Sequence, residues 1–168
     1  NLSIVDKMNK ADSNSKLLLG DIYVTMELPF LAVPQYLEVL NSEEKLSAQK
    51  ALRMIEVLVR STYWKEANEV APQIKEKFGG LFTPKEANKF DSLRAEILFA
   101  LNRKEEAVQA LEELVERDPM NGRVLILLAG HYGTSFRENL DKNVQAADEF
   151  AAKAIFLYER ATNLEDSS

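Results

Sequence analysis

The chain has 168 residues, of which 46% are hydrophobic and 29% are charged, a composition typical of a folded globular protein. Its formal net charge of −6 and isoelectric point near 5.0 argue against a dominant phosphate-binding surface, so we expect no nucleic-acid partner. The absence of cysteine excludes disulfides, thiolate metal sites and a thiol nucleophile.

No apolar run approaches the roughly 18 residues that a membrane-spanning helix needs, so we expect no membrane insertion by this chain. The chain starts at Asn1 without a basic and apolar leader. We therefore interpret it as a soluble piece of a longer protein or as a processed form. The cytoplasm and the periplasm fit this composition equally well, so the compartment stays unknown.

Hydrophobic periodicity predicts helices from the N-terminus onward. Residues 1–12 carry Ile4, Val5 and Met8 at helical spacing, which predicts the end of a preceding helix or a cap. From residue 13 the pattern becomes regular, with a first helix capped by a serine at 13 or 15. A turn at 27–29 precedes a second helix, in which Pro34 is expected to cause a bend or to delay the start by a turn.

A second pair of helices is predicted over 46–60 and 64–77. The glycines of segment 78–82 interrupt the pattern, because paired glycines end helices and favour turns. The helical pattern then restarts strongly at Thr83, Pro84 and Glu86. Thr83 is suited to cap the new helix, Pro84 to occupy its first position, and Glu86 to complete a capping box.

Two further pairs of helices follow in the C-terminal half. Residues 91–121 read as two short amphipathic helices closed by Pro119. Residues 122–132 are predicted to form another helix, broken at 133–135, and a long alanine-rich helix is predicted over about 140–164. Because no segment alternates apolar and polar residues over a sustained run, we predict no strand. The predicted fold class is all-α.

The spacing of apolar and small residues resembles that of the tetratricopeptide repeat (TPR) family, whose unit is a helical hairpin of about 34 residues. The first hairpin has Leu-Gly-x-x-Tyr at Leu19, Gly20 and Tyr23, followed by Ala32 and Tyr36 at the expected offsets. The matching positions of the third hairpin are Ala95, Leu98, Ala107, Leu111, Leu114 and the closing Pro119. Small residues at the Gly and Ala positions let the two helices of a hairpin approach closely.

This resemblance implies a right-handed α-α superhelix, a solenoid of about four hairpins over residues 13–168. The expected units are about 13–46, 48–81, 88–121 and 122–166, with an insertion between the two helices of the last. Internal prolines and uneven spacing between units predict local distortion of the superhelix.

In the TPR family the first helices line a concave groove that holds an extended peptide or a helix of a partner protein. Asp21, Glu56 and Glu96 occupy groove-facing positions of successive units, which predicts a partner with a basic segment; the alternative is that they are ordinary solvated charges. These carboxylates stand where the family's clamp for a C-terminal carboxylate needs neutral donors, so we do not expect that activity. The other predicted groove residues are Leu52, Arg53, Arg60, Ser92, Phe99, Arg123 and Ile126.

The sequence shows no catalytic constellation, and we predict neither an enzyme nor a cofactor. His131 is the only histidine, so a cluster of histidine metal ligands is impossible, and we expect His131 to be packed or hydrogen-bonded. The predicted function is that of a protein–protein interaction scaffold or adaptor. The alternative is an oligomerisation or assembly module, which is motivated by Phe136, Phe150 and Phe156 around and after the insertion.

Overall fold

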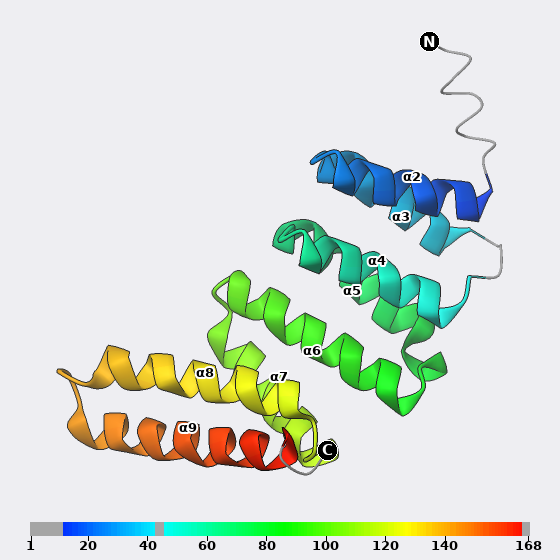
Figure 1. Ribbon diagram of the computed structural model, residues 1–168. Helices are drawn as coiled ribbons and strands as arrows, with labels where there is room; N and C mark the ends of the chain where they lie inside the picture. Colours follow the sequence, from blue (N-terminus) through cyan, green and yellow to red (C-terminus); the bar gives the residue numbers. More distant parts are fainter. Residues whose placement is uncertain (1–11, 43–45, 166–168) are drawn as a thin grey trace. The chain divides into compact units, whose positions relative to one another are not determined.

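The computed structural model describes residues 12–42 and 46–165, and every regular element in these ranges is helical (Figure 1). The elements are the α-helices α2 to α9 and one short 3₁₀ turn, and these residues contain no strand. The all-α prediction is therefore confirmed. The helix or cap predicted over residues 1–12 lies outside the described residues, except for Asp12.

The first hairpin consists of α2 (Ser13–Thr25) and α3 (Pro29–Asn41). The N-cap of α2 is Asp12 rather than a serine at 13 or 15, because its carboxylate accepts a hydrogen bond from the backbone N–H of Ser15 at 2.7 Å. Pro29 opens α3 as predicted. The helix begins at Pro29 and continues through Pro34, so of the two predicted effects of Pro34 the delayed start does not occur.

The next helices are α4 (Ala48–Arg60), α5 (Trp64–Phe78) and α6 (Pro84–Ala100), with the 3₁₀ turn Gly79–Leu81 between the last two. The predicted capping box at the start of α6 is confirmed. The Thr83 N–H donates to Glu86 Oε2 at 2.9 Å, and the Glu86 N–H donates to Thr83 Oγ1 at 3.3 Å.

Three helix-to-helix turns share one backbone geometry. Glu27, Thr62 and Asn102 all have left-handed φ angles, of 60°, 62° and 60°. This conformation is uncommon for residues other than glycine, and its recurrence at the end of α2, α4 and α6 indicates a repeated stop signal. The intervals between the three turns equal those between Ala32, Ala67 and Ala107, so the turns follow the same uneven repeat as the sequence pattern.

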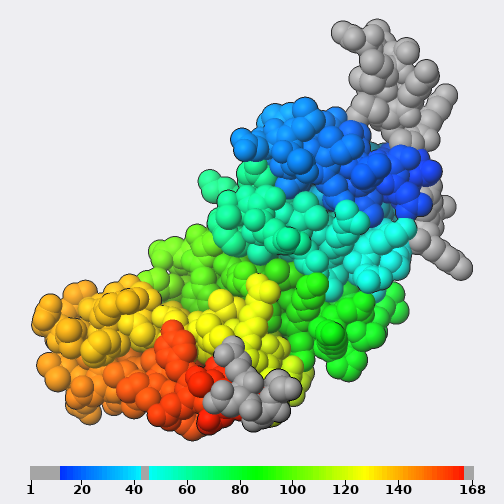
Figure 2. Space-filling view, viewed as in Figure 1, coloured from blue at the N-terminus to red at the C-terminus, as the bar shows by residue number. Residues whose placement is uncertain are grey.

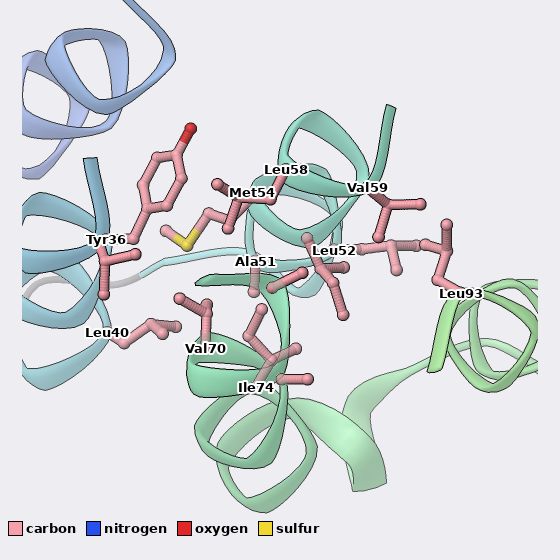
Figure 3. Packing of buried hydrophobic residues seen from close by; sticks show 14 of the residues in the cluster. Tyr36, Leu40, Ala51, Leu52, Met54, Leu58, Val59, Val70, Ile74 and Leu93 are labelled. Atoms are coloured by element: carbon pink, nitrogen blue, oxygen red, sulfur yellow. The ribbon is translucent and has the colours of Figure 1, made fainter. Parts of the chain in front are cut away.

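The chain divides into two compact units, an N-terminal unit of residues 1–102 and a C-terminal unit of residues 103–168. In the N-terminal unit α2 packs against α3 and α4, and α5 packs against α3 and α4, while α6 contacts both α4 and α5. Its core includes Tyr36 of α3, Met54 and Leu58 of α4, and Ile74 of α5, all 0% exposed (Figure 3). Complete burial of such a side chain stabilises the fold by about 1.5–3 kcal/mol.

The C-terminal unit contains α7 (Lys104–Arg117), α8 (Gly122–Asn139) and α9 (Val144–Glu165). The helix break predicted at 133–135 is wrong, because α8 continues to Asn139 and the Thr134 hydroxyl donates to the Gly130 carbonyl at 3.1 Å. One interior glycine costs a helix only about 1 kcal/mol, which the long antiparallel contact between α8 and α9 offsets. The residues expected to form an insertion therefore lengthen this hairpin.

A close approach between α2 and α3 generates the first prediction. A Cβ atom added at Gly20 would lie 2.3 Å from Cε1 of the Tyr36 ring, and Tyr36 is 0% exposed. We expect Gly20→Ala to lower the free energy of unfolding by about 1–3 kcal/mol, because the buried ring has no room to move. Urea denaturation followed by circular dichroism measures this change.

Gly133→Ala serves as the matched control, because a Cβ at Gly133 meets no atom within 4 Å. We expect this substitution to raise the free energy of unfolding by about 0.5–1 kcal/mol through helix propensity alone. Equal effects of the two substitutions would contradict the close-packing role of Gly20.

Candidate functional site

The candidate site lies on the face of the N-terminal unit formed by α2, α4 and α6. These helices lie side by side, and their surfaces follow one another from blue through teal to green in the space-filling view (Figure 2). They are the first helices of the three predicted hairpins in this unit. Their exposed positions are therefore where the sequence predicts a groove.

Asp21 of α2 is the centre of a polar network that joins three helices. Its Oδ1 accepts a hydrogen bond from the Tyr36 hydroxyl of α3 at 2.7 Å, and its Oδ2 accepts one from Arg53 Nη2 of α4 at 2.7 Å. The Asp21 side chain is only 14% exposed. Burial and the bond to Asp21 raise the pKa of Tyr36, so this hydroxyl stays protonated and donates. Asp21 is thus a paired carboxylate within the fold.

Glu56 of α4 is also paired with a cation of a neighbouring helix. Its carboxylate forms an ion pair with Lys89 of α6, and the side chains are 23% and 52% exposed. An exposed pair of this kind contributes little to stability, on the order of 0–1 kcal/mol, but it compensates the charge of the carboxylate. Glu96, the third carboxylate of the predicted acidic groove, is partly buried on α6.

A pocket of about 630 Å³ opens between α4 and α6 on this face. It is lined by Gln49, Lys50, Leu52, Arg53, Glu56, Thr83, Lys85, Glu86 and Lys89. Four of these side chains are cationic and two are anionic. The charge balance is therefore the reverse of the acidic groove expected from the carboxylate positions. The sequence analysis did not predict Lys50, Lys85 and Lys89 as pocket residues. These lysines lie up to two helical turns before the groove positions that the TPR resemblance predicts on the same helices.

The remaining predicted groove residues of this unit differ in accessibility. Leu52 is 3% exposed and lies with Val59 on the side of α4 that faces Leu93 of α6, where it forms the apolar base of the pocket (Figure 3). Ser92 is 4% exposed and its hydroxyl donates to the Asn88 carbonyl at 2.9 Å, so this hydroxyl serves the fold. Arg60 is exposed and Phe99 is partly buried.

The other two predicted residues, Arg123 and Ile126, belong to α8 of the C-terminal unit. Both are exposed, Ile126 to 45%. On the same helix, His131 Nε2 lies 3.3 Å from the Ser135 hydroxyl, and the His131 and Tyr132 rings are 5.6 Å apart. Burial, with a smaller effect of Lys104, lowers the pKa of His131. This is the packed, hydrogen-bonded environment expected for His131.

A second pocket, of about 440 Å³, is formed by α7, α8 and α9 within the C-terminal unit. The Tyr132 hydroxyl donates to Glu112 at its edge, and burial raises the pKa of Tyr132. Phe156 lines this pocket and is 58% exposed, with the Arg160 guanidinium 5.5 Å from its ring centre. The surface therefore combines an apolar ring with charged neighbours.

Metal centres and membrane-spanning helices are two further features that would indicate a function. Among residues 12–42 and 46–165, no three His, Asp or Glu side chains are grouped as a metal site would require. In the same residues, no helix has the length and apolar character needed to span a membrane. Compared with protein-family models the chain matches none, and a comparison with curated proteins gives no significant match.

The polar network at Asp21 generates the second prediction. We expect Tyr36→Phe to lower the free energy of unfolding at neutral pH by about 1–2 kcal/mol, because it removes the 2.7 Å bond to Asp21 but keeps the ring. The raised pKa of Tyr36 adds stability that is complete below the unfolded pKa of about 10 and declines as pH rises above it. The difference between wild type and variant should therefore shrink above pH 10.

Tyr23→Phe is the control, because the Tyr23 hydroxyl makes no hydrogen bond within the part of the chain that the structure describes. Urea titrations at pH 8 and in steps above pH 10 separate the two variants. A loss for Tyr36→Phe that grows with rising pH would contradict the assigned network.

Proposed function

We propose that this chain is a protein–protein interaction scaffold or adaptor that holds a segment of a partner protein against the first-helix face of α2, α4 and α6. The observation that carries the proposal is the pocket between α4 and α6, which opens on the surface where the TPR resemblance places a ligand groove. The proposal includes a right-handed solenoid of about four hairpins. The repeated turns at Glu27, Thr62 and Asn102 support that arrangement for the first three.

The tight packing of α4 and α6 makes this face suitable as a rigid docking surface. The residues beneath the pocket are well packed: Met54 and Ile55 of α4 and Phe90 of α6 are 0% exposed. This core holds the backbones of α4 and α6 in place before a ligand arrives, which reduces the entropic cost of binding. The pocket has space for several side chains of an extended segment or of one face of a helix.

Site-specific photocrosslinking tests the proposal and does not require the identity of the partner. A benzophenone amino acid is placed at Gln49 or Arg60, which are exposed on α4, and as controls at Lys65 or Glu69, which are exposed on α5. After irradiation in extract of the source cells, we expect the α4 positions to give an adduct with a discrete protein and the α5 positions to give none. Mass spectrometry identifies the adduct. Adducts from the α5 positions alone, or no adduct at all, would overturn the proposal.

The second candidate function is that of an oligomerisation or assembly module. The observation favouring it is the exposure of large apolar side chains on α9: Ile155 (57% exposed) and Tyr158 (45% exposed) line one pocket, and Phe156 (58% exposed) lines another. Exposed apolar side chains of this size are a common feature of surfaces that bind another protein. Phe150 is different: it is partly buried, and its ring stacks on Tyr132 at 6.1 Å. Phe136 is also partly buried.

Sedimentation velocity over a hundredfold concentration range distinguishes this candidate from the first. If α9 mediates assembly, wild type associates as concentration rises. Phe156→Ser then weakens association by at least about tenfold, because it removes an aromatic side chain that becomes buried only in the assembly. Leu81→Ser is the control, because Leu81 is 68% exposed but lies in the N-terminal unit. A wild type that stays monomeric throughout excludes self-assembly.

A further inference from the structure

The α4–α6 pocket has more positive than negative charge, in a chain whose net charge is −6. We infer that the partner segment held in this pocket is acidic, with carboxylate side chains that contact Lys50 and Lys85. This inference rests on the proposed function and specifies the chemistry of its ligand. It differs from the basic segment that the carboxylates Asp21, Glu56 and Glu96 predict.

The two carboxylates of the pocket are already engaged within the protein. Glu56 is paired with Lys89. Glu86 accepts hydrogen bonds from the Thr83 N–H and hydroxyl, both at 2.9 Å, and these bonds lower the pKa of Glu86. Neither carboxylate is therefore free to bind a cationic ligand without giving up a contact that the fold uses.

The cations fall into two groups. Arg53 and Lys89 have carboxylate partners in Asp21 and Glu56. Lys50 donates to a neutral acceptor, the Asn14 side-chain oxygen, at 2.5 Å. Lys85 is exposed and has no hydrogen-bond or ion-pair partner within residues 12–42 and 46–165. Neither Lys50 nor Lys85 thus forms an ion pair among the described residues, although the charge of Lys50 helps to lower the pKa of nearby Asp12.

The backbone at the start of α4 and α6 also contributes positive electrostatic potential to the pocket. Lys50 lies in the first turn of α4 and Lys85 in the first turn of α6. The N-terminal end of each helix carries a partial positive charge from its aligned peptide dipoles. Glu86 offsets part of this charge at α6, whereas the first turn of α4 has no acidic residue. The pocket therefore favours anionic groups at the end where both helices begin.

A peptide is a better match for this pocket than a nucleic acid. A polyphosphate chain would approach a protein of net charge −6, and its affinity depends on many cations along an extended surface. Here the pocket offers two cations without an ion-pair partner in the described part of the chain, beside an apolar base at Leu52 and an amide at Gln49. A segment that combines acidic and apolar side chains complements both features.

Fluorescence anisotropy with defined peptides tests the inference. The probe is a fluorescein-labelled, C-terminally amidated peptide of six glutamates around one leucine, and its counterpart has glutamine at every glutamate position. We expect the glutamate peptide to bind about tenfold more tightly than the glutamine peptide at 50 mM salt, with the difference largely lost at 500 mM. Equal binding of the two peptides, or no binding of either, would overturn the inference.

Charge reversals with a matched control locate the binding. We expect Lys85→Glu to weaken the glutamate peptide about fivefold, and the Lys50→Glu, Lys85→Glu double variant to weaken it further. Lys65→Glu makes the same change of charge at an exposed position of α5 and should alter affinity less than about twofold. Circular dichroism checks that each variant is folded. Equal effects at Lys85 and Lys65 would show that the net charge of the protein, and not the pocket, governs binding.

The outcomes separate this inference from the proposed function. If photocrosslinking at Gln49 captures a partner but the glutamate peptide does not bind, the acidic ligand is wrong while the scaffold function stands. If the peptide binds and loses affinity on Lys85→Glu, but crosslinking captures no protein, the pocket chemistry holds and the scaffold function fails. An eight-nucleotide thymidine oligomer that binds more tightly than the peptide, and depends on Lys85, would assign the pocket to nucleic acid and overturn the inference.

Discussion

The contact between Gly20 and the ring of Tyr36 is the constraint on which the N-terminal unit depends. Because position 20 has no Cβ, the buried ring comes close enough to α2 for its hydroxyl to reach Asp21. Asp21 in turn holds Arg53 of α4. One packing requirement therefore places a polar network across three helices, and α4 in this arrangement forms one wall of the pocket. A larger residue at position 20 would disturb the site as well as the core.

Charge compensation between neighbouring helices explains why the pocket is basic. Asp21 of α2 pairs with Arg53 of α4, and Glu56 of α4 pairs with Lys89 of α6. Each carboxylate is thus matched by a cation of the next helix, and the cations that remain lie in the first helical turns. Because the cation of each pair is exposed, these pairs contribute little to stability, but they determine which charges are left for a ligand.

The sequence predicted the features that depend on local spacing. Helix class, the capping box at Thr83 and the small residue at position 20 all follow from patterns within one or two turns of helix. The features that the sequence predicted wrongly depend on groups that packing brings together. Packing against α9 stabilises α8 beyond Gly133, and Ser92 is buried although the TPR resemblance predicts a groove residue at its position. The charge of the pocket also depends on which residues of α4 and α6 become neighbours, which spacing within one helix does not specify.

The two candidate surfaces differ in the force that would drive binding, and this difference separates them experimentally. The α4–α6 pocket of the N-terminal unit relies on exposed charges, whose attraction is screened over about 10 Å at 0.1 M salt. The α9 surface around Phe156, in the C-terminal unit, relies on apolar area, and burial of such area is strengthened by salts that are excluded from protein surfaces. A partner released by added salt therefore belongs to the pocket, and one that is retained belongs to α9. Because the two surfaces lie in different units, the two proposed functions do not exclude each other.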